Sequence, residues 1–217
     1  MRAYRYLPRQ YAEDAVKFGI FRLSTTAACG QLESKLNDPL DGAVLCRPSL
    51  DLGSTKANDL VKLEQLKRFG IHIEPGSAER VVFDRPKLIQ RQPGWILCFS
   101  DIADNAYIQT ADPTADTVVE IADLFQLAAR LSAAHPEVRQ VAHAGSQADP
   151  RIRIDLVKYA QREFEDLNDD VFADPFVKAE RFRPEREVRI FWNSRRPVQP
   201  LIIEAPDIRG LVRIVGF

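Results

Sequence analysis

The chain has 217 residues, of which 45% are hydrophobic and 28% are charged, and its 30 Lys and Arg residues against 31 Asp and Glu residues give a formal net charge of −1. These values are typical of one globular domain over residues 1–217, and they argue against a disordered chain, a collagen or a coiled coil. The chain is no polycation, so a nucleic-acid site would have to be a local patch.

The first 25 residues predict a strand, a helix and a second strand. Residues 4–7 are aromatic and strand-prone, and Pro8 stops them. A short helical pattern follows over residues 10–18, and Gly19 ends it as a C-cap. Residues 20–24 then resume an extended conformation.

The middle of the chain predicts a helix and several strands. Residues 58–69 place leucines on one helical face, and residues 71–73 and 81–83 are strand candidates. The apolar run 95–99 follows a Pro-Gly turn and is typical of a buried central strand.

The clearest helical pattern covers residues 118–134. Thr117 and Glu120 have the spacing of a capping box, and Pro136 follows the predicted end.

Strands are predicted at 152–157, 187–192, 201–203 and 211–215. Strands outnumber helices without a regular alternation, so we predict an α+β fold with a mixed, mostly antiparallel sheet and flanking helices. The residues that the inward phase of these elements predicts to be core are Trp95, Leu97, Phe99, Leu124, Phe125, Val188 and Ile190.

The N-terminus and the cysteines predict a cytoplasmic protein. The opening MRAYRYLPRQ lacks the apolar core of a signal peptide, and no apolar run approaches the roughly 18 residues of a membrane span. Cys29, Cys46 and Cys98 are widely spaced, and the three histidines share no metal-ligand spacing. Cys98 lies in an apolar run and is predicted to be a small buried core residue. We expect no metal site and no membrane contact.

Two early segments carry polar groups that could bind a ligand. Arg5 stands between Tyr4 and Tyr6, so on a strand it points to the opposite face from both. A guanidinium facing a cleft is a good clamp for a pyrophosphate, although Arg5 can equally be an ordinary surface residue. The hydroxyls of Ser24 and Thr25 at a strand end can bond a ribose or phosphate, or their own backbone in a turn.

Glu185 and Glu187 are two residues apart at the start of a predicted strand and therefore project from one face. Two neighbouring carboxylates repel each other, which raises one pKa and suits acid, base or charge-stabilising roles. The alternative is a solvated charged edge that pairs with nearby arginines.

A nucleic-acid-acting enzyme is a further alternative, because five arginines form a short basic cluster, whose acidic neighbours could instead neutralise it. The arginines are Arg183, Arg186, Arg189, Arg195 and Arg196, and the neighbours are Asp166, Asp169, Asp170 and Asp174.

Several short motifs occur in one order along nearly the whole chain. They are Tyr4–Leu7, Gly19–Thr25, Asn37–Asp41, Leu97–Ser100, Phe176–Lys178, Glu185–Arg189 and Ile214–Gly216. This series resembles an uncharacterised bacterial family found among phage-defence and abortive-infection genes. Residues 101–113 depart from the pattern of that family.

The same motifs also resemble the ADP-ribosyltransferase superfamily, which implies a split sheet and NAD as the substrate, without a metal. Arg5, with Tyr6 beside it, would hold the NAD pyrophosphate, and Ser24 or Thr25 would support the nicotinamide-side ribose. Glu187 would be the catalytic glutamate and Glu185 would address the acceptor.

The resemblance implies transfer of ADP-ribose to a nucleic acid or a protein, or NAD hydrolysis, in a toxin or phage-defence setting. An antitoxin or immunity protein would be a further partner. A catalytically inactive module that binds a nucleotide or a partner is the alternative of another class. If the transferase interpretation holds, Arg5, Ser24 and Glu187 converge on one cleft, and Glu187→Gln slows nicotinamide release with little effect on stability.

Overall fold

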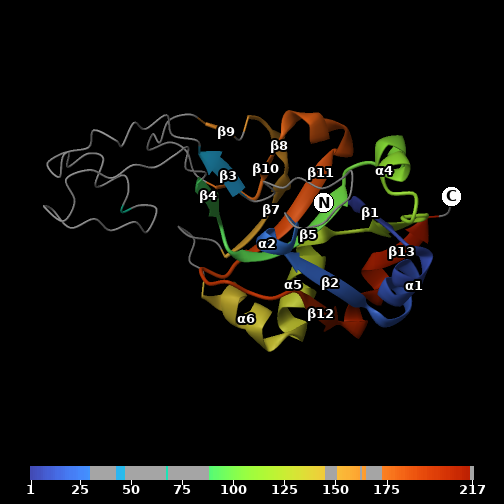
Figure 1. Cartoon of the computed structure of the whole chain (residues 1–217). Coiled ribbons are helices and arrows are strands. Elements are labelled where there is room, and N and C mark those ends of the chain that lie inside the picture. Colours follow the sequence, from blue (N-terminus) through green and yellow to red (C-terminus); the bar gives the residue numbers. More distant parts are fainter. Residues whose placement is uncertain are drawn as a thin grey trace, which may run out of the picture.

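The computed structural model describes residues 1–29, 43–46, 67, 88–144, 151–161, 163–164 and 173–215. These residues form an α+β structure around an eight-stranded antiparallel sheet with flanking helices (Figure 1), which confirms the fold class predicted from the sequence at this level. The main sheet contains β1 (Ala3–Leu7), β2 (Ile20–Thr25), β5 (Gly94–Ser100), β6 (Thr117–Ile121), β7 (Ile152–Leu156), β11 (Glu187–Asn193), β12 (Leu201–Glu204) and β13 (Val212–Val215).

Two smaller sheets accompany the main one. They contain β3 (Ala43–Cys46), β4 (Leu88–Arg91) and β9 (Glu163–Phe164) in one, and β8 (Lys158–Tyr159) and β10 (Val177–Lys178) in the other. The β3–β9 and β8–β10 pairs are parallel, so the fold is mixed rather than purely antiparallel.

Strand β5 has three neighbours in the main sheet. β11 pairs with it along all of Gly94–Ser100 and so occupies one edge. The other edge is shared, because β1 pairs at Ser100, opposite Tyr4, whereas β2 pairs at the other end of β5. No described strand pairs with residues 97–99 on this shared edge. We call this interval between β1 and β2 the fork.

The helix that joins the two arms of the fork follows the sequence pattern closely. α1 (Arg9–Phe18) begins directly after Pro8, and Gly19 ends it in the left-handed region at φ 70°. Glycine adopts that conformation at no steric cost, which is why it ends the helix. The predicted strand, helix and strand of the first 25 residues are confirmed.

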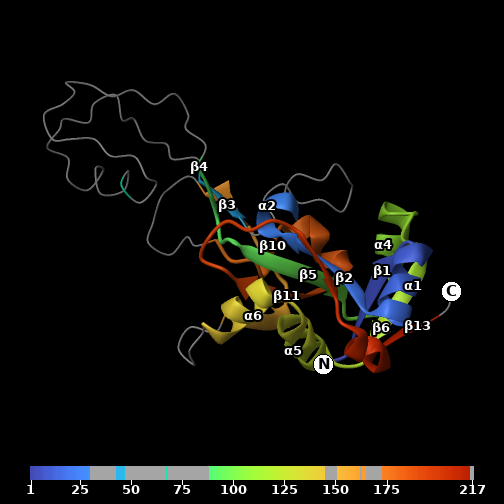
Figure 2. The ribbon, with the colours of Figure 1, turned by 90° about the horizontal axis from the view of Figure 1, so that it is seen from below.

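The two faces of the main sheet carry different neighbours. α5 (Leu124–Ala134) and α6 (Pro136–His143) cover one face, which holds the larger apolar core, and both lie below β5 and β11 in Figure 2. On this face Leu124, Leu127 and Leu131 pack with Trp95 and Trp192. The 3₁₀ helix η2 (Glu180–Glu185) and strands β8 and β10 lie on the other side (Figure 1).

That second face carries a smaller core of Ile96, Phe176 and Phe191, with Cys29 and Cys98 packed against it. The remaining short helices are α2 (Thr26–Cys29), α4 (Ala106–Ala111) and the 3₁₀ helix η3 (Pro206–Leu211).

The helix predicted over residues 118–134 is wrong in its first part. Residues Thr117–Ile121 form β6, which pairs with β1 and β13, because its β-branched residues suit a strand buried between two neighbours. Glu120 meets Arg213 across the sheet and caps no helix. α5 starts at Leu124, with Asp123 as its cap through a 3.0 Å hydrogen bond from the Phe125 amide.

Because α5 starts later than predicted, one predicted core residue lies on the surface. Phe125 is 56% exposed, whereas the other six predicted core residues are buried. Pro136 does not simply follow a helix but begins α6, a position that suits its missing N–H.

The predicted strands at 95–99, 152–157, 187–192, 201–203 and 211–215 are confirmed with small changes of boundary. The predicted helix 58–69, apart from Lys67, and the predicted strands 71–73 and 81–83 lie outside the described residues. Within the described part of the chain, no helix has the length and hydropathy to cross a bilayer.

Candidate functional site

Two carboxylates and two cations are buried together where β11 begins. Arg189 donates two hydrogen bonds to Glu187, from Nε to Oε1 at 2.6 Å and from Nη2 to Oε2 at 3.0 Å. Lys178 Nζ bridges the two acids, at 3.1 Å from Glu187 Oε2 and 2.5 Å from Glu185 Oε2. None of the four residues is more than 6% exposed. We call Lys178, Glu185, Glu187 and Arg189 the buried cluster.

Three neighbouring groups complete the surroundings of Glu187. Its backbone amide donates a 2.8 Å hydrogen bond to the hydroxyl of Tyr159 on β8. The thiol of Cys98, which lies across the β5–β11 ladder, hydrogen-bonds to its carboxylate. Arg189 also donates to the carbonyl of Pro175, so the guanidinium is held from two sides.

The two carboxyls of the buried cluster differ in protonation. Burial raises the pKa of Glu185 to about 8, because the attraction of Lys178 only partly offsets the loss of hydration and the charge of Glu187 adds to it. Burial also disfavours ionisation of Glu187, but Arg189 and Lys178 outweigh it and hold the pKa of Glu187 far below its usual range. At neutral pH the pair therefore consists of a protonated Glu185 and an ionised Glu187.

The hydrogen bonds of Glu185 agree with that protonation. Its Oε1 atom is buried and has no hydrogen-bond donor among the described residues, as expected of a carboxyl oxygen that itself carries the proton. Glu187 lies near enough to accept that proton's hydrogen bond.

The turn between the two glutamates is clamped from β5 and the segment that follows it. Arg186 has a φ of 50°, an uncommon value for a residue with a Cβ. Asn105 Nδ2 and Ser100 Oγ donate to the carbonyl of Glu185 at 3.0 and 3.1 Å, and the side chain of Arg186 pairs with Asp101 at 2.8 Å. These bonds hold Glu185 and Glu187 in fixed positions on the two sides of the turn.

Arg5 lies at the fork with its guanidinium over aromatic rings. Its Cζ is 5.7 Å from the centroid of the Phe21 ring and 6.0 Å from that of Phe99. Among the described residues, no carboxylate pairs with it and no hydrogen bond reaches its side chain. Burial lowers the pKa of Arg5 to about 10, while the nearby thiols of Cys98 and Cys29 raise it slightly. The guanidinium is thus cationic at neutral pH and has no described counter-charge.

Two thiols connect Arg5 to the other predicted site residues. Cys98 interacts with both Arg5 and Glu187, and Cys29 on α2 interacts with Arg5. The Sγ atom of Cys29 lies 3.4 Å from Ser24 Oγ. Both thiols are partly exposed, so the prediction that Cys98 is only a buried core residue is wrong.

The strand register separates Arg5 from Glu187. Tyr4 and Glu187 both pair with Ser100, so these three side chains share one face of the sheet. Arg5 follows Tyr4 and starts on the opposite face, over Phe21 and Phe99 of the larger core. The structure therefore does not bring Arg5 and Glu187 onto one face, and the described groups link them only through Cys98.

Tyr6 and Thr25 make structural hydrogen bonds to backbone groups. The Tyr6 hydroxyl bonds to the carbonyl of Ala103 at 2.8 Å and accepts from the amide of Asn105 at 2.7 Å. Thr25 Oγ1 accepts from the amide of Ala28 at 3.0 Å, which is the local backbone alternative foreseen for this hydroxyl.

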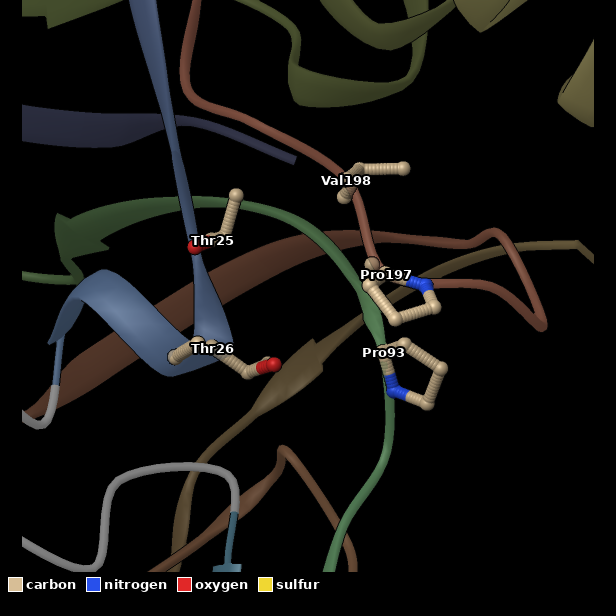
Figure 3. A pocket seen from close by; sticks show the side chains of 7 residues that line it. Thr25, Thr26, Pro93, Pro197 and Val198 are labelled. Carbon is tan, nitrogen blue, oxygen red and sulfur yellow. The ribbon is translucent and has the colours of Figure 1, made fainter.

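A hollow of about 250 Å³ lies beside Thr25, and Thr26, Pro93, Pro197 and Val198 also line it (Figure 3). Its lining is mainly apolar and includes neither Arg5 nor a glutamate of the buried cluster. The hollow therefore contains one predicted site residue, Thr25, but neither Arg5 nor the buried cluster.

Of the five clustered arginines near β11, three are paired or buried, whereas Arg195 and Arg196 are exposed. Arg183 pairs with Glu180 at 2.6 Å, Arg186 pairs with Asp101, and Arg189 is fully buried. Asp174, one of the acids expected to neutralise them, pairs with Arg153 instead. The other three acids, Asp166, Asp169 and Asp170, lie outside the described residues.

Comparison with known proteins adds no relative. No protein-family model, no curated protein and no solved structure matches the chain. Within the described ranges, no group of three or more His, Cys, Asp or Glu side chains could hold a metal ion. The family resemblance thus rests on the sequence motifs alone.

Sequence reasoning missed residues that hold the two glutamates. Lys178 belongs to a quoted motif, but its distance from Glu185 in sequence hid their contact. Asn105 lies in the segment 101–113 that departs from the family pattern, where no motif pointed to it. Arg189 was not missed: the charged-edge alternative already paired the glutamates with nearby arginines, and residues two apart on a strand share a face.

Proposed function

We propose that this chain binds NAD at the fork through Arg5 and transfers ADP-ribose to a macromolecule, or hydrolyses NAD, as an ADP-ribosyltransferase-like protein of a toxin or phage-defence setting. The observation that carries the proposal is Arg5, a cation with no described counter-charge at the divergence of β1 and β2. A diphosphate would supply that counter-charge through two charge-assisted hydrogen bonds. The divergence of the two strands also supports the finer fold assignment, a split sheet of the ADP-ribosyltransferase type.

The two glutamates supply complementary chemistry for this reaction. Departure of nicotinamide leaves positive charge on the ribose, and an ionised Glu187 in a dry surrounding would stabilise that charge. Glu185 would address the acceptor. Cys98 interacts with both Arg5 and Glu187 and would line the path of the ribose.

A binding module without turnover is the second candidate, and two observations favour it. Glu187 is 5% exposed and its charge is met by Arg189 and Lys178, as in a structural ion pair. Its side chain also shares no face with Arg5. In this case the fork would still hold the nucleotide, but no bond would break.

Calorimetric titration with NAD, combined with chromatography of released nicotinamide, tests both candidates. We expect the wild type to bind NAD and Arg5→Met to bind at least about tenfold more weakly, the loss of one charge-assisted contact. Arg22→Met is the matched control, since Arg22 is exposed on β2 and should not affect binding. Equal NAD binding by wild type and Arg5→Met would refute the assignment of Arg5.

Turnover decides between the candidates. The transferase predicts nicotinamide release that Glu187→Gln slows by about 10²-fold, and transfer that Glu185→Gln impairs more than hydrolysis. The binding module predicts NAD binding without nicotinamide release in the wild type.

A further inference from the structure

We propose that Lys178 is a positioning residue whose ammonium, by bridging Glu185 and Glu187, sets the pH at which Glu185 loses its proton and with it the pH range in which the site works. The inference about activity rests on the proposed function, whereas the inference about the proton concerns the folded protein alone.

The ammonium of Lys178 lies close to both carboxyls and to an aromatic ring. It lies 2.5 Å from Glu185 Oε2, 3.1 Å from Glu187 Oε2 and 4.7 Å from the centroid of the Phe182 ring. Lys178 itself is 4% exposed, so water does not screen its charge. A cation at this distance acts strongly on a buried carboxyl.

The other groups around Glu185 cannot replace Lys178. Arg189 reaches Glu187 with two hydrogen bonds, and its contact with the Pro175 carbonyl keeps it there. Tyr159 from β8 is neutral at neutral pH, because burial raises its pKa to about 12, and Cys98 from β5 carries no positive charge in either protonation state. The Arg186–Asp101 pair is internally neutralised at the rim of the turn. Among these cationic groups, Lys178 is the one whose charged atom contacts Glu185.

Removal of the ammonium has opposite consequences for the two acids. Glu187 stays ionised, because Arg189 remains bonded to it. Glu185 loses the attraction that favours its charged form, so it holds its proton to a higher pH. Because the carboxyls interact, the observable quantity is the titration of the pair.

The experiment compares wild type, Lys178→Met, Lys178→Arg and Lys158→Met. Lys158 is the matched control, because it lies opposite Val177 on the neighbouring strand and is exposed. Urea unfolding from pH 5 to pH 10 reports the protonation of Glu185, since the midpoint falls with pH only while the folded state keeps the proton. Nicotinamide release over the same range reports the working pH.

In Lys178→Met the urea midpoint should keep falling to a pH at least about one unit higher than in wild type. The basic limb of nicotinamide release should move in the same direction. Lys178→Arg should restore both curves and Lys158→Met should leave them unchanged. Superimposable midpoint curves for folded wild type and Lys178→Met would overturn the proposal.

Two outcomes separate this inference from the proposed function. If no protein releases nicotinamide but the midpoint curves shift, the transferase proposal and the activity part of this inference fail, and the role of Lys178 in placing the proton stands. If Lys178→Met does not fold, Glu185→Gln decides, because it keeps the shape of the side chain without the titration. A midpoint that falls with pH in Glu185→Gln as it does in wild type would then overturn the proposal.

Discussion

The side-chain amide of Asn105 donates a 3.0 Å hydrogen bond to the backbone carbonyl of Glu185, 80 residues away in the sequence. The same amide reaches the carbonyl of Pro184 at 3.0 Å and the hydroxyl of Ser100 at 3.3 Å. A residue of the segment before α4 thereby fixes the turn that carries both glutamates.

Replacement of Asn105 by Ala should lower the free energy of unfolding by about 1–3 kcal/mol, because the carbonyl of Glu185 loses one of its two donors and the carbonyl of Pro184 loses the Asn105 amide. Urea denaturation measures the change. Asn105→Asp is the control, since it keeps the oxygen that caps α4 and lacks the amide donors. An Asp variant as stable as wild type would show that the amide contacts contribute nothing.

The stability of the protein should fall as the pH rises from 4.5 to 8. The pKa of Glu185 is about 8 in the folded state against an ordinary value of 4.5, so in this range the unfolded chain has released a proton that the folded chain keeps. The contribution of this group is complete below pH 4.5 and declines by at most about 1.4 kcal/mol per pH unit until pH 8. Urea unfolding at several pH values should show this slope in wild type and a flatter one in Glu185→Gln.

Glu187→Gln should destabilise the protein by about 3–5 kcal/mol, because it leaves the charges of Arg189 and Lys178 buried without their carboxylate. The sequence predicted little effect of this change on stability, and the buried ion pairs of Glu187 correct that prediction. Glu180→Gln is the control, since it removes an exposed ion pair with Arg183 and should hardly change the urea midpoint. Similar midpoints for the two variants would contradict the buried network.

Leu124→Ala should cost about 2–5 kcal/mol, because Leu124 is fully buried in the larger core. The neighbouring Phe125→Ala should cost far less, since that ring is 56% exposed. Thermal unfolding of both variants tests where α5 begins. A larger loss for Phe125 would restore the helix start predicted from the sequence.

Local sequence patterns predicted those helices and strands whose type and ends depend on their own residues. Gly19 and Pro8 mark the ends of α1, and the apolar run of β5 marks a central strand. The pattern failed at Thr117–Ile121, where a helical cap spacing competed with β-branched residues. Pairing with β1 and β13 decided that competition, and pairing partners cannot be read from a local pattern.

The candidate site was predictable only in part, for a similar reason. The spacing of Glu185 and Glu187 predicted two carboxyls on one strand face, but Glu185 ends η2, before the strand begins. The two carboxyls do lie close together, and burial, more than the charge of Glu187, raises the pKa of Glu185. Lys178 could not be assigned to them from the sequence, because it reaches them by the packing of β10 against the turn. The face of Arg5 depended on a register between β1, β5 and β11 that the sequence does not display.

The central position of β5 has a consequence for synthesis of the protein. The edge that β11 fills stays open until the ribosome has added residues 101–193, because β11 is the strand that pairs along its whole length. During that time the apolar side chains of Trp95, Leu97 and Phe99 lack their final neighbours, and an open strand edge invites pairing with other chains. A nascent chain stalled before β11 should therefore bind chaperones or aggregate, whereas one released after β13 should not.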